Sequence, residues 1–149
     1  MVTRNIIAIA ALCVMFSSCH FSQATKQNQS NQDKIEKVEI KSVNLLIMTC
    51  YAIDCDSFDN SFSQAKVTTI TDSSSIGELS GILGSLEPTD STYSDYVDTR
   101  AKIKLISNRD TSEICLNYLM LSKDGTLYKT PKELVDYIER LNSPSSGIK

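Results

Sequence analysis

Five cysteines carry the most distinctive chemistry in this chain of 149 residues. A thiol can form a disulfide, bind a soft metal ion or carry a covalent modification. Common structural zinc sites combine closely spaced cysteine pairs with histidine, but this sequence has no C-x-x-C pair and a single histidine, His20. We therefore interpret the cysteines as candidates for disulfides and for covalent modification, and we expect no cofactor.

The first 18 residues have the order of an export signal. Arg4 supplies positive charge, residues 6–16 form an uncharged apolar run, and the small Ser17 and Ser18 follow. A membrane-spanning helix needs about 20 apolar residues, so this run is too short to span a bilayer. A buried N-terminal helix is the alternative, and the order of charge, apolar run and small residues favours a cleaved signal peptide over residues 1–18.

The residues Phe16, Ser17, Ser18 and Cys19 resemble the signal box of bacterial lipoproteins, in which a cysteine becomes the lipidated first residue. Cys13 fits this box poorly, because the preceding Leu12 is not small. The resemblance implies that Cys19 carries acyl chains, palmitate among them, and that the protein is anchored to a membrane of the cell envelope. The outer membrane is the expected location, and both of its faces remain open.

The rest of the chain divides into a tether, a domain and a tail. Residues 19–33 are rich in Gln, Asn and Ser, and such a stretch buries too little apolar surface to fold. We expect a single domain over residues 34–143 and a disordered tail over residues 144–149. This organisation resembles that of many small, uncharacterised lipoproteins of gut-type Gram-negative bacteria, but it points to no named family.

Export leaves Cys50, Cys55 and Cys115 in an oxidising compartment, where disulfides persist. Three is an odd number, so one thiol stays unpaired. Cys50 and Cys55 enclose four residues, and we favour a local bridge between them with Cys115 as a buried free thiol in an apolar strand. The alternative joins Cys115 to Cys55 or to Cys50 across the fold.

Two polar regions are candidate binding sites. Asp54, Asp56 and Asp59 are weak candidates for a calcium site, because the glycine and glutamate positions of an EF-hand loop are missing; a solvated loop is the simpler interpretation. A second region contains two tyrosines and an alternating basic stripe, and it predicts either a binding rim or an ordinary charged outer face. Its residues are Tyr93, Tyr96, Arg100, Lys102 and Lys104.

The periodicity of the domain predicts a two-layer α+β fold. Alternating apolar residues indicate about five strands, at 34–49, 65–71, 97–107, 112–122 and 126–129, and Asp124-Gly125 is typical of a hairpin turn. Helical spacing follows Ser75 and again follows Thr130, each serine or threonine serving as a predicted cap. The order β-β-α-β-β-β-α predicts an antiparallel sheet with two helices on one face.

The function expected from these features is binding rather than catalysis. The predicted domain has no histidine and no glycine-rich phosphate loop, and the net charge of −3 argues against nucleic-acid binding. We expect a membrane-tethered interaction domain with a protein partner, such as an inhibitor or an immunity protein. The alternative is a small-ligand or metal-binding protein, or a histidine-free enzyme, that uses the acidic loops.

Overall fold

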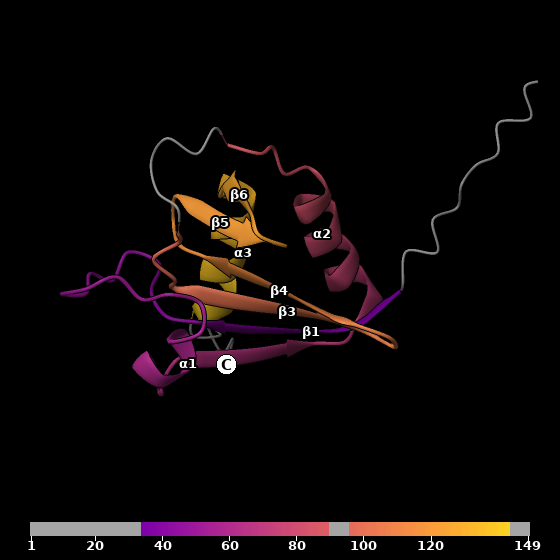
Figure 1. The fold of residues 1–149 in the computed structure, drawn as a ribbon. Helices are drawn as coiled ribbons and strands as arrows, with labels where there is room; N and C mark the ends of the chain where they lie inside the picture. Colours follow the sequence, from indigo (N-terminus) through magenta and orange to yellow (C-terminus); the bar gives the residue numbers. More distant parts are fainter. Residues whose placement is uncertain (1–33, 90–95, 144–149) are drawn as a thin grey trace, which may run out of the picture. The chain divides into compact units, whose positions relative to one another are not determined.

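The computed structural model describes residues 34–89 and 96–143, which form an open antiparallel sheet of six strands with three helices (Figure 1). The predicted α+β class with an antiparallel sheet is confirmed. In chain order the elements are β1 (Ile35–Ser42), α1 (Phe58–Ser61), β2 (Lys66–Ile70), α2 (Ser73–Gly84), β3 (Ala101–Ser107), β4 (Thr111–Leu116), β5 (Met120–Lys123), β6 (Thr126–Lys129) and α3 (Lys132–Asn142).

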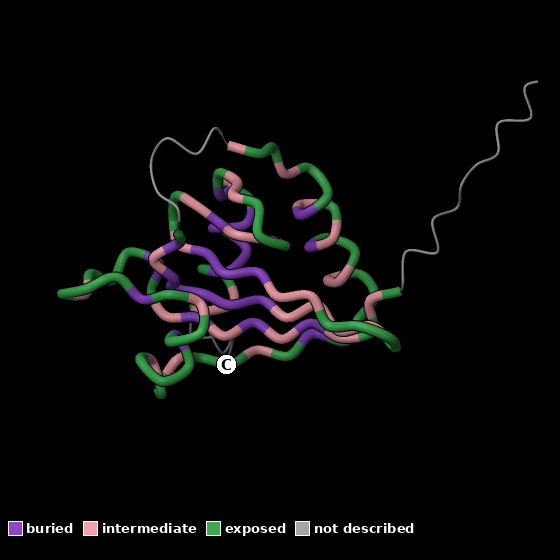
Figure 2. Tube along the Cα trace, viewed as in Figure 1, coloured by how far each residue is buried: buried purple, intermediate pink, exposed green. Residues whose placement is uncertain are grey.

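The sheet has the strand order β2-β1-β3-β4-β5-β6, and every neighbouring pair is antiparallel. The predicted hairpin between β5 and β6 is confirmed, because Asp124 and Gly125 both have positive φ, 51° and 74°. Helices α2 and α3 share one hydrophobic core with β1, β3, β4 and β5, so both cover the same face of the sheet. Figure 2 shows buried positions following the central strands and exposed positions on the connecting loops.

The core is built from the alternate residues that face these two helices. Ile40, Ile103 and Ile114 are fully buried on the sheet, and Leu79 of α2 and Leu134 of α3 are fully buried against them. Each buried aliphatic side chain of this size contributes about 1.5–3 kcal/mol relative to an exposed one. The cooperative burial of this face holds β1, β3 and β4 in one fixed register.

The structure differs from the predicted strands in three places. The first strand ends at Ser42 instead of continuing to residue 49, and the predicted strand 97–107 begins only at Ala101. The predicted strand 112–122 is divided into β4 and β5. Asn117 causes the division, because its Oδ1 accepts hydrogen bonds from the backbone N–H groups of Leu119 (2.8 Å) and Met120 (2.9 Å). This local side-chain turn replaces the ladder bonds that a continuous strand would need.

Both predicted helix caps are also wrong. In α2 the backbone N–H of Ser75 donates to the Asp72 carboxylate (2.8 Å), so Asp72 is the cap and the helix begins three residues earlier than a Ser75 cap would allow. In α3 the hydroxyl of Thr130 donates to the carbonyl of Asn117 (3.0 Å), and Pro131 occupies the cap position. Thr130 therefore ties the helix entrance to the β4–β5 turn.

The two edges of the sheet, β6 and β2, differ in how far other parts of the chain cover them. Beyond β6, Pro88 forms an isolated bridge with Tyr128, and the N–H of Thr89 donates to the carbonyl of Leu127 (3.1 Å). The segment after α2 therefore covers part of the β6 edge. At the opposite edge lies β2, which pairs with β1 alone among the described strands.

Candidate functional site

The face of the sheet opposite α2 and α3 is partly covered by the connection between β1 and β2, residues 43–65, which we call the covering segment. Arg100 and Lys102 point to this face, yet they are only 3% and 5% exposed. The predicted solvent-facing stripe is therefore wrong at these two positions, because alternation identifies the two faces of a strand but not what covers each. Lys104, further along β3, is partly exposed and lies 3.7 Å from Glu113.

Two positions of the predicted binding rim remain. Tyr96 is exposed and precedes β3 in the chain. Tyr93 lies outside the described residues, as do Cys19, the tether and the tail.

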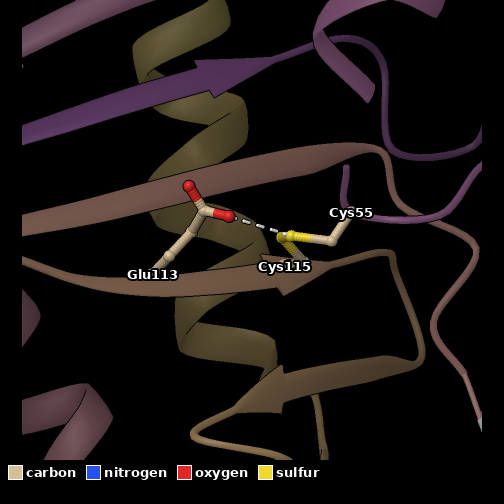
Figure 3. A group of neighbouring side chains, drawn as sticks. All are labelled: Cys55, Glu113 and Cys115. Carbon is tan, nitrogen blue, oxygen red and sulfur yellow. Dashed lines mark hydrogen bonds between the residues drawn. A yellow bond between two sulfur atoms is a disulfide. The ribbon is translucent and has the colours of Figure 1, made fainter. Parts of the chain in front are cut away.

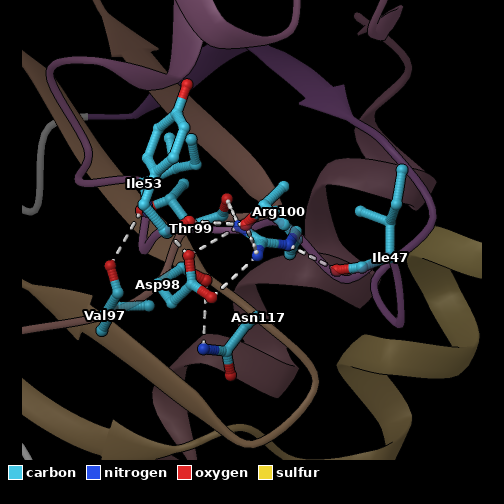
Figure 4. A network of polar contacts seen from close by, with 9 residues as sticks. Ile47, Ile53, Val97, Asp98, Thr99, Arg100 and Asn117 are labelled. Atoms are coloured by element: carbon cyan, nitrogen blue, oxygen red, sulfur yellow. Dashed lines mark hydrogen bonds and ion pairs between the residues drawn. The ribbon is translucent and has the colours of Figure 1, made fainter.

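Arg100 is the centre of a polar network that fixes the covering segment to the sheet (Figure 4). Its Nε donates to the carbonyl of Ile47 (2.9 Å), and its Nη2 donates to Thr49 Oγ1 (2.7 Å). The same guanidinium forms a two-point ion pair with Asp98, with both N–O distances at 2.7 Å. Planar bidentate pairs of this kind fix geometry more strongly than a single contact does.

Asp98 connects the network to the covering segment and to the β4–β5 turn. Its Oδ1 accepts a hydrogen bond from the backbone N–H of Ile53 (2.8 Å), and its carbonyl accepts one from Asn117 Nδ2 (3.1 Å). The N–H of Thr99 donates to the carbonyl of Ile53 (2.6 Å). The covering segment is thus held at Ile47, Thr49 and Ile53 by the residues that directly precede β3.

The predicted metal candidate Asp59 is engaged by two lysines. Its carboxylate lies 2.8 Å from Lys41 Nζ and 3.0 Å from Lys102 Nζ. These hydrogen bonds, first from Lys41 and then from Lys102, hold the pKa of Asp59 below its usual range. The carboxylate is therefore ionised at neutral pH, and its stabilising effect is lost only as the pH falls through that lowered pKa.

The other two aspartates of this group have different surroundings. Asp54 Oδ1 accepts the backbone N–H of Ser57 (2.7 Å), which lowers the pKa of Asp54. Asp56 is exposed. Among the described residues, the acidic group of the covering segment does not assemble into a set of converging metal ligands.

Cys55 of the covering segment forms a disulfide with Cys115 of β4, and their Cα atoms are 5.7 Å apart (Figure 3). The favoured local bridge between Cys50 and Cys55 is wrong, and Cys50 is an exposed free thiol. The physical reason is register: Cys115 lies directly opposite Lys102, so it faces the covering segment rather than the helical layer. The sequence alone could have indicated this face. Cys115 lies between Ile114 and Leu116, which belong to the core shared with the helices, so its side chain points to the opposite face of the strand.

A carboxylate lies beside the disulfide, and a lysine lies beside that carboxylate. Glu113 Oε1 lies 3.2 Å from Cys55 Sγ, and Lys102 Nζ lies 3.5 Å from the same oxygen. Glu113 and Cys115 are two residues apart on β4, so their side chains share one face of the sheet. This cluster joins sulfur, carboxylate and ammonium groups on the covered face.

Exposed apolar side chains gather beside the Arg100 network. Leu46, Ile47, Tyr118 and Leu119 line a cavity of about 270 Å³ whose lining also includes Asp98 and Arg100. Met48, next along the chain, is 92% exposed. We call this set the apolar patch: Leu46, Ile47, Met48, Tyr118 and Leu119. Sequence reasoning missed it, because residues 45–48 resembled the end of a strand and residues 118–119 the middle of one.

Within the described residues no helix is both long and apolar enough to cross a membrane. No family model, curated protein or solved structure matches this chain, so its function is inferred from the geometry above.

Proposed function

We propose that this protein is an exported lipoprotein, anchored at Cys19, whose domain binds a protein partner through the apolar patch and catalyses no reaction. The patch is the observation that carries this proposal. Leu46 is 63% exposed and Leu119 is 66% exposed, although the two side chains line the same cavity. Soluble domains rarely gather large apolar side chains in the open without a binding role.

The rigid base of the patch supports binding. Arg100, whose side chain is almost completely buried, donates hydrogen bonds to the carbonyl of Ile47 and to the hydroxyl of Thr49. The turn that presents Tyr118 and Leu119 is held by Asn117. A surface fixed before association loses less conformational entropy on binding, and this favours affinity.

Charged groups of both signs lie around the patch. Asp98 lines its cavity, and Lys129 and Lys132 line a second cavity together with Tyr118 and Leu119. Protein interfaces commonly surround an apolar centre with polar and charged groups of this kind. The partner's surface is expected to be apolar with charges of both signs at its margin, as an inhibitor or immunity role would permit.

The alternative of an enzyme or carrier that uses the acidic loops has less support. Asp59 is neutralised by Lys41 and Lys102, and Asp54 is committed to a backbone N–H group. These carboxylates would have to give up their present partners before they could act on a ligand.

We expect the patch to contact the partner directly in cells. A photo-crosslinking residue placed at Met48 or at Leu119 should label one protein, which then binds the purified domain as a binary complex. Met48→Asp and Leu119→Asp should each weaken that complex by at least about tenfold, because central apolar contacts dominate such interfaces.

Val67 provides the matched control, because it is 60% exposed but lies on the edge strand β2. Val67→Asp should leave the affinity of the binary complex unchanged. If position 67 labels the same protein as strongly, or if the crosslinker at Met48 labels only lipid, the patch is not the binding surface.

The anchor has a separate test. Cys19→Ser should move the protein from the membrane fraction to the soluble fraction, or leave it as the unprocessed precursor, and should abolish labelling by an alkyne-tagged palmitate. Two or more acyl chains give stable membrane binding, and the mutant has none. Cys13→Ser is the control and should fractionate like the wild type. A Cys19→Ser protein that still sediments with membranes would contradict lipid anchoring.

A further inference from the structure

The cluster around the disulfide contains three groups that can ligate a metal ion. One ligand atom each from Cys55, Glu113 and Cys115 lies within 4.8 Å of the other two. Figure 3 shows the Glu113 carboxylate turned towards the sulfur of Cys55. Two cysteines and one carboxylate provide donors of the types that zinc accepts, and three protein ligands leave a fourth position open.

We propose that, in the dithiol form, Cys55, Cys115 and Glu113 bind one divalent cation of the zinc type. The disulfide must first take up two electrons and two protons from a dithiol reductant, which gives two thiols and the oxidised reductant. The cation then displaces both thiol protons, and two metal–sulfur bonds form. The disulfide and the metal-bound form exclude each other, because each uses the same two sulfur atoms.

Distances within the cluster fit this exchange. A tetrahedral zinc ion with Zn–S bonds of about 2.3 Å holds two sulfur atoms about 3.8 Å apart. Rotation about the Cα–Cβ bonds can separate the two sulfur atoms, since the Cα atoms of Cys55 and Cys115 are 5.7 Å apart. Glu113 Oε1 already lies 3.2 Å from Cys55 Sγ, so the third donor is in place.

Lys102 can balance the net negative charge that such a metal site would carry. A cation of charge +2 with three anionic ligands leaves a net charge of −1, and Lys102 supplies one positive charge at the edge of the cluster. Its Nζ lies 3.5 Å from Glu113 and 3.0 Å from Asp59. When the metal takes Glu113, Lys102 retains Asp59 as its partner and is not left buried without a counter-ion.

This inference does not depend on the proposed binding function. The redox state of the surroundings decides which arrangement the two sulfur atoms adopt. An oxidising compartment holds the disulfide, and reduction opens the metal site.

The test uses the full chain with Cys13→Ser, Cys19→Ser and Cys50→Ser, so that only the two site cysteines remain. After reduction with a phosphine, titration with Co²⁺ should produce a thiolate-to-cobalt charge-transfer band that saturates at one ion per chain and disappears when Zn²⁺ is added. Glu113→Gln should weaken binding by at least about tenfold, and Cys115→Ser should abolish the band. Glu36→Gln, an exposed glutamate of β1, is the control and should bind as the parent does.

Circular dichroism of the reduced chain separates loss of the site from loss of the fold. Zn²⁺ should raise the thermal midpoint of the reduced parent and leave that of Cys115→Ser unchanged, because an ion that binds only the native state stabilises it. The proposal is overturned if the reduced parent gives no charge-transfer band, if Glu113→Gln binds cobalt like the parent, or if the reduced chain is unfolded and Zn²⁺ does not restore its structure.

Discussion

Arg100→Met is expected to lower the free energy of unfolding by about 1–3 kcal/mol, the usual cost of leaving polar groups without their hydrogen-bond partners. The substitution leaves Asp98 without its cation and leaves the carbonyl of Ile47 without its donor. The Arg100 side chain is almost completely buried, whereas the Asp98 side chain is 39% exposed, so water offsets part of the loss. Denaturant unfolding followed by circular dichroism measures the change.

Arg140→Met is the matched control, because Arg140 forms an ion pair of the same length, 2.7 Å, with Glu78, but on the exposed surface. It should leave the unfolding midpoint unchanged within error, since exposed pairs contribute little. Arg100→Lys should also destabilise the protein, because an ammonium group cannot reproduce the bidentate contact with Asp98. Equal midpoint shifts in Arg100→Met and Arg140→Met would show that the network does not hold the fold.

Loss of the disulfide is the second large effect. Cys55→Ser with Cys115→Ser should lower the free energy of unfolding by about 4 kcal/mol, the chain-entropy value for a closed loop of this size. The two cysteines are 60 residues apart, so the unfolded chain gains considerable freedom when the crosslink is removed. The comparison is made under non-reducing conditions, by thermal or denaturant unfolding.

Cys50→Ser distinguishes the two pairings. Cys50 is an exposed free thiol, so its replacement should leave the unfolding midpoint unchanged and the disulfide intact in a non-reducing peptide map. If Cys50→Ser instead removed the disulfide while Cys115→Ser retained it, the local bridge would be the true pairing.

Much of the sheet could be predicted from the sequence, because its signals are local. The alternation along β3 and the Asp124-Gly125 turn each reflect the conformation of a few neighbouring residues, and both predictions agree with the structure. The apolar stripe of α3 also needs no distant partner to be recognised. These elements were sufficient to predict the α+β class.

The candidate site could not be predicted, because it depends on contacts between distant segments. Alternation placed Arg100 and Lys102 on one face of the predicted strand 97–107, but only the folded chain shows that residues 43–65 cover that face. The apolar run near Leu46 resembles strand sequence as much as it resembles an exposed loop. Some local signals were missed or misread as well. The side chain of Asn117 ends a strand, and Asp72 and Pro131 occupy the cap positions that the sequence pattern gave to Ser75 and Thr130.

The covering segment has a consequence for the order of folding. Arg100 and Ile47 are 53 residues apart in sequence, and Cys55 and Cys115 are 60 apart, so these contacts close long loops. Such closures lose chain entropy before they gain contact energy, and contacts of this kind form slowly. Lys102 and Cys115, which contact the segment, lie opposite each other on β3 and β4, so its complete docking surface exists once these strands have paired. A disulfide between Cys55 and Cys115 therefore marks a chain in which these distant segments have met.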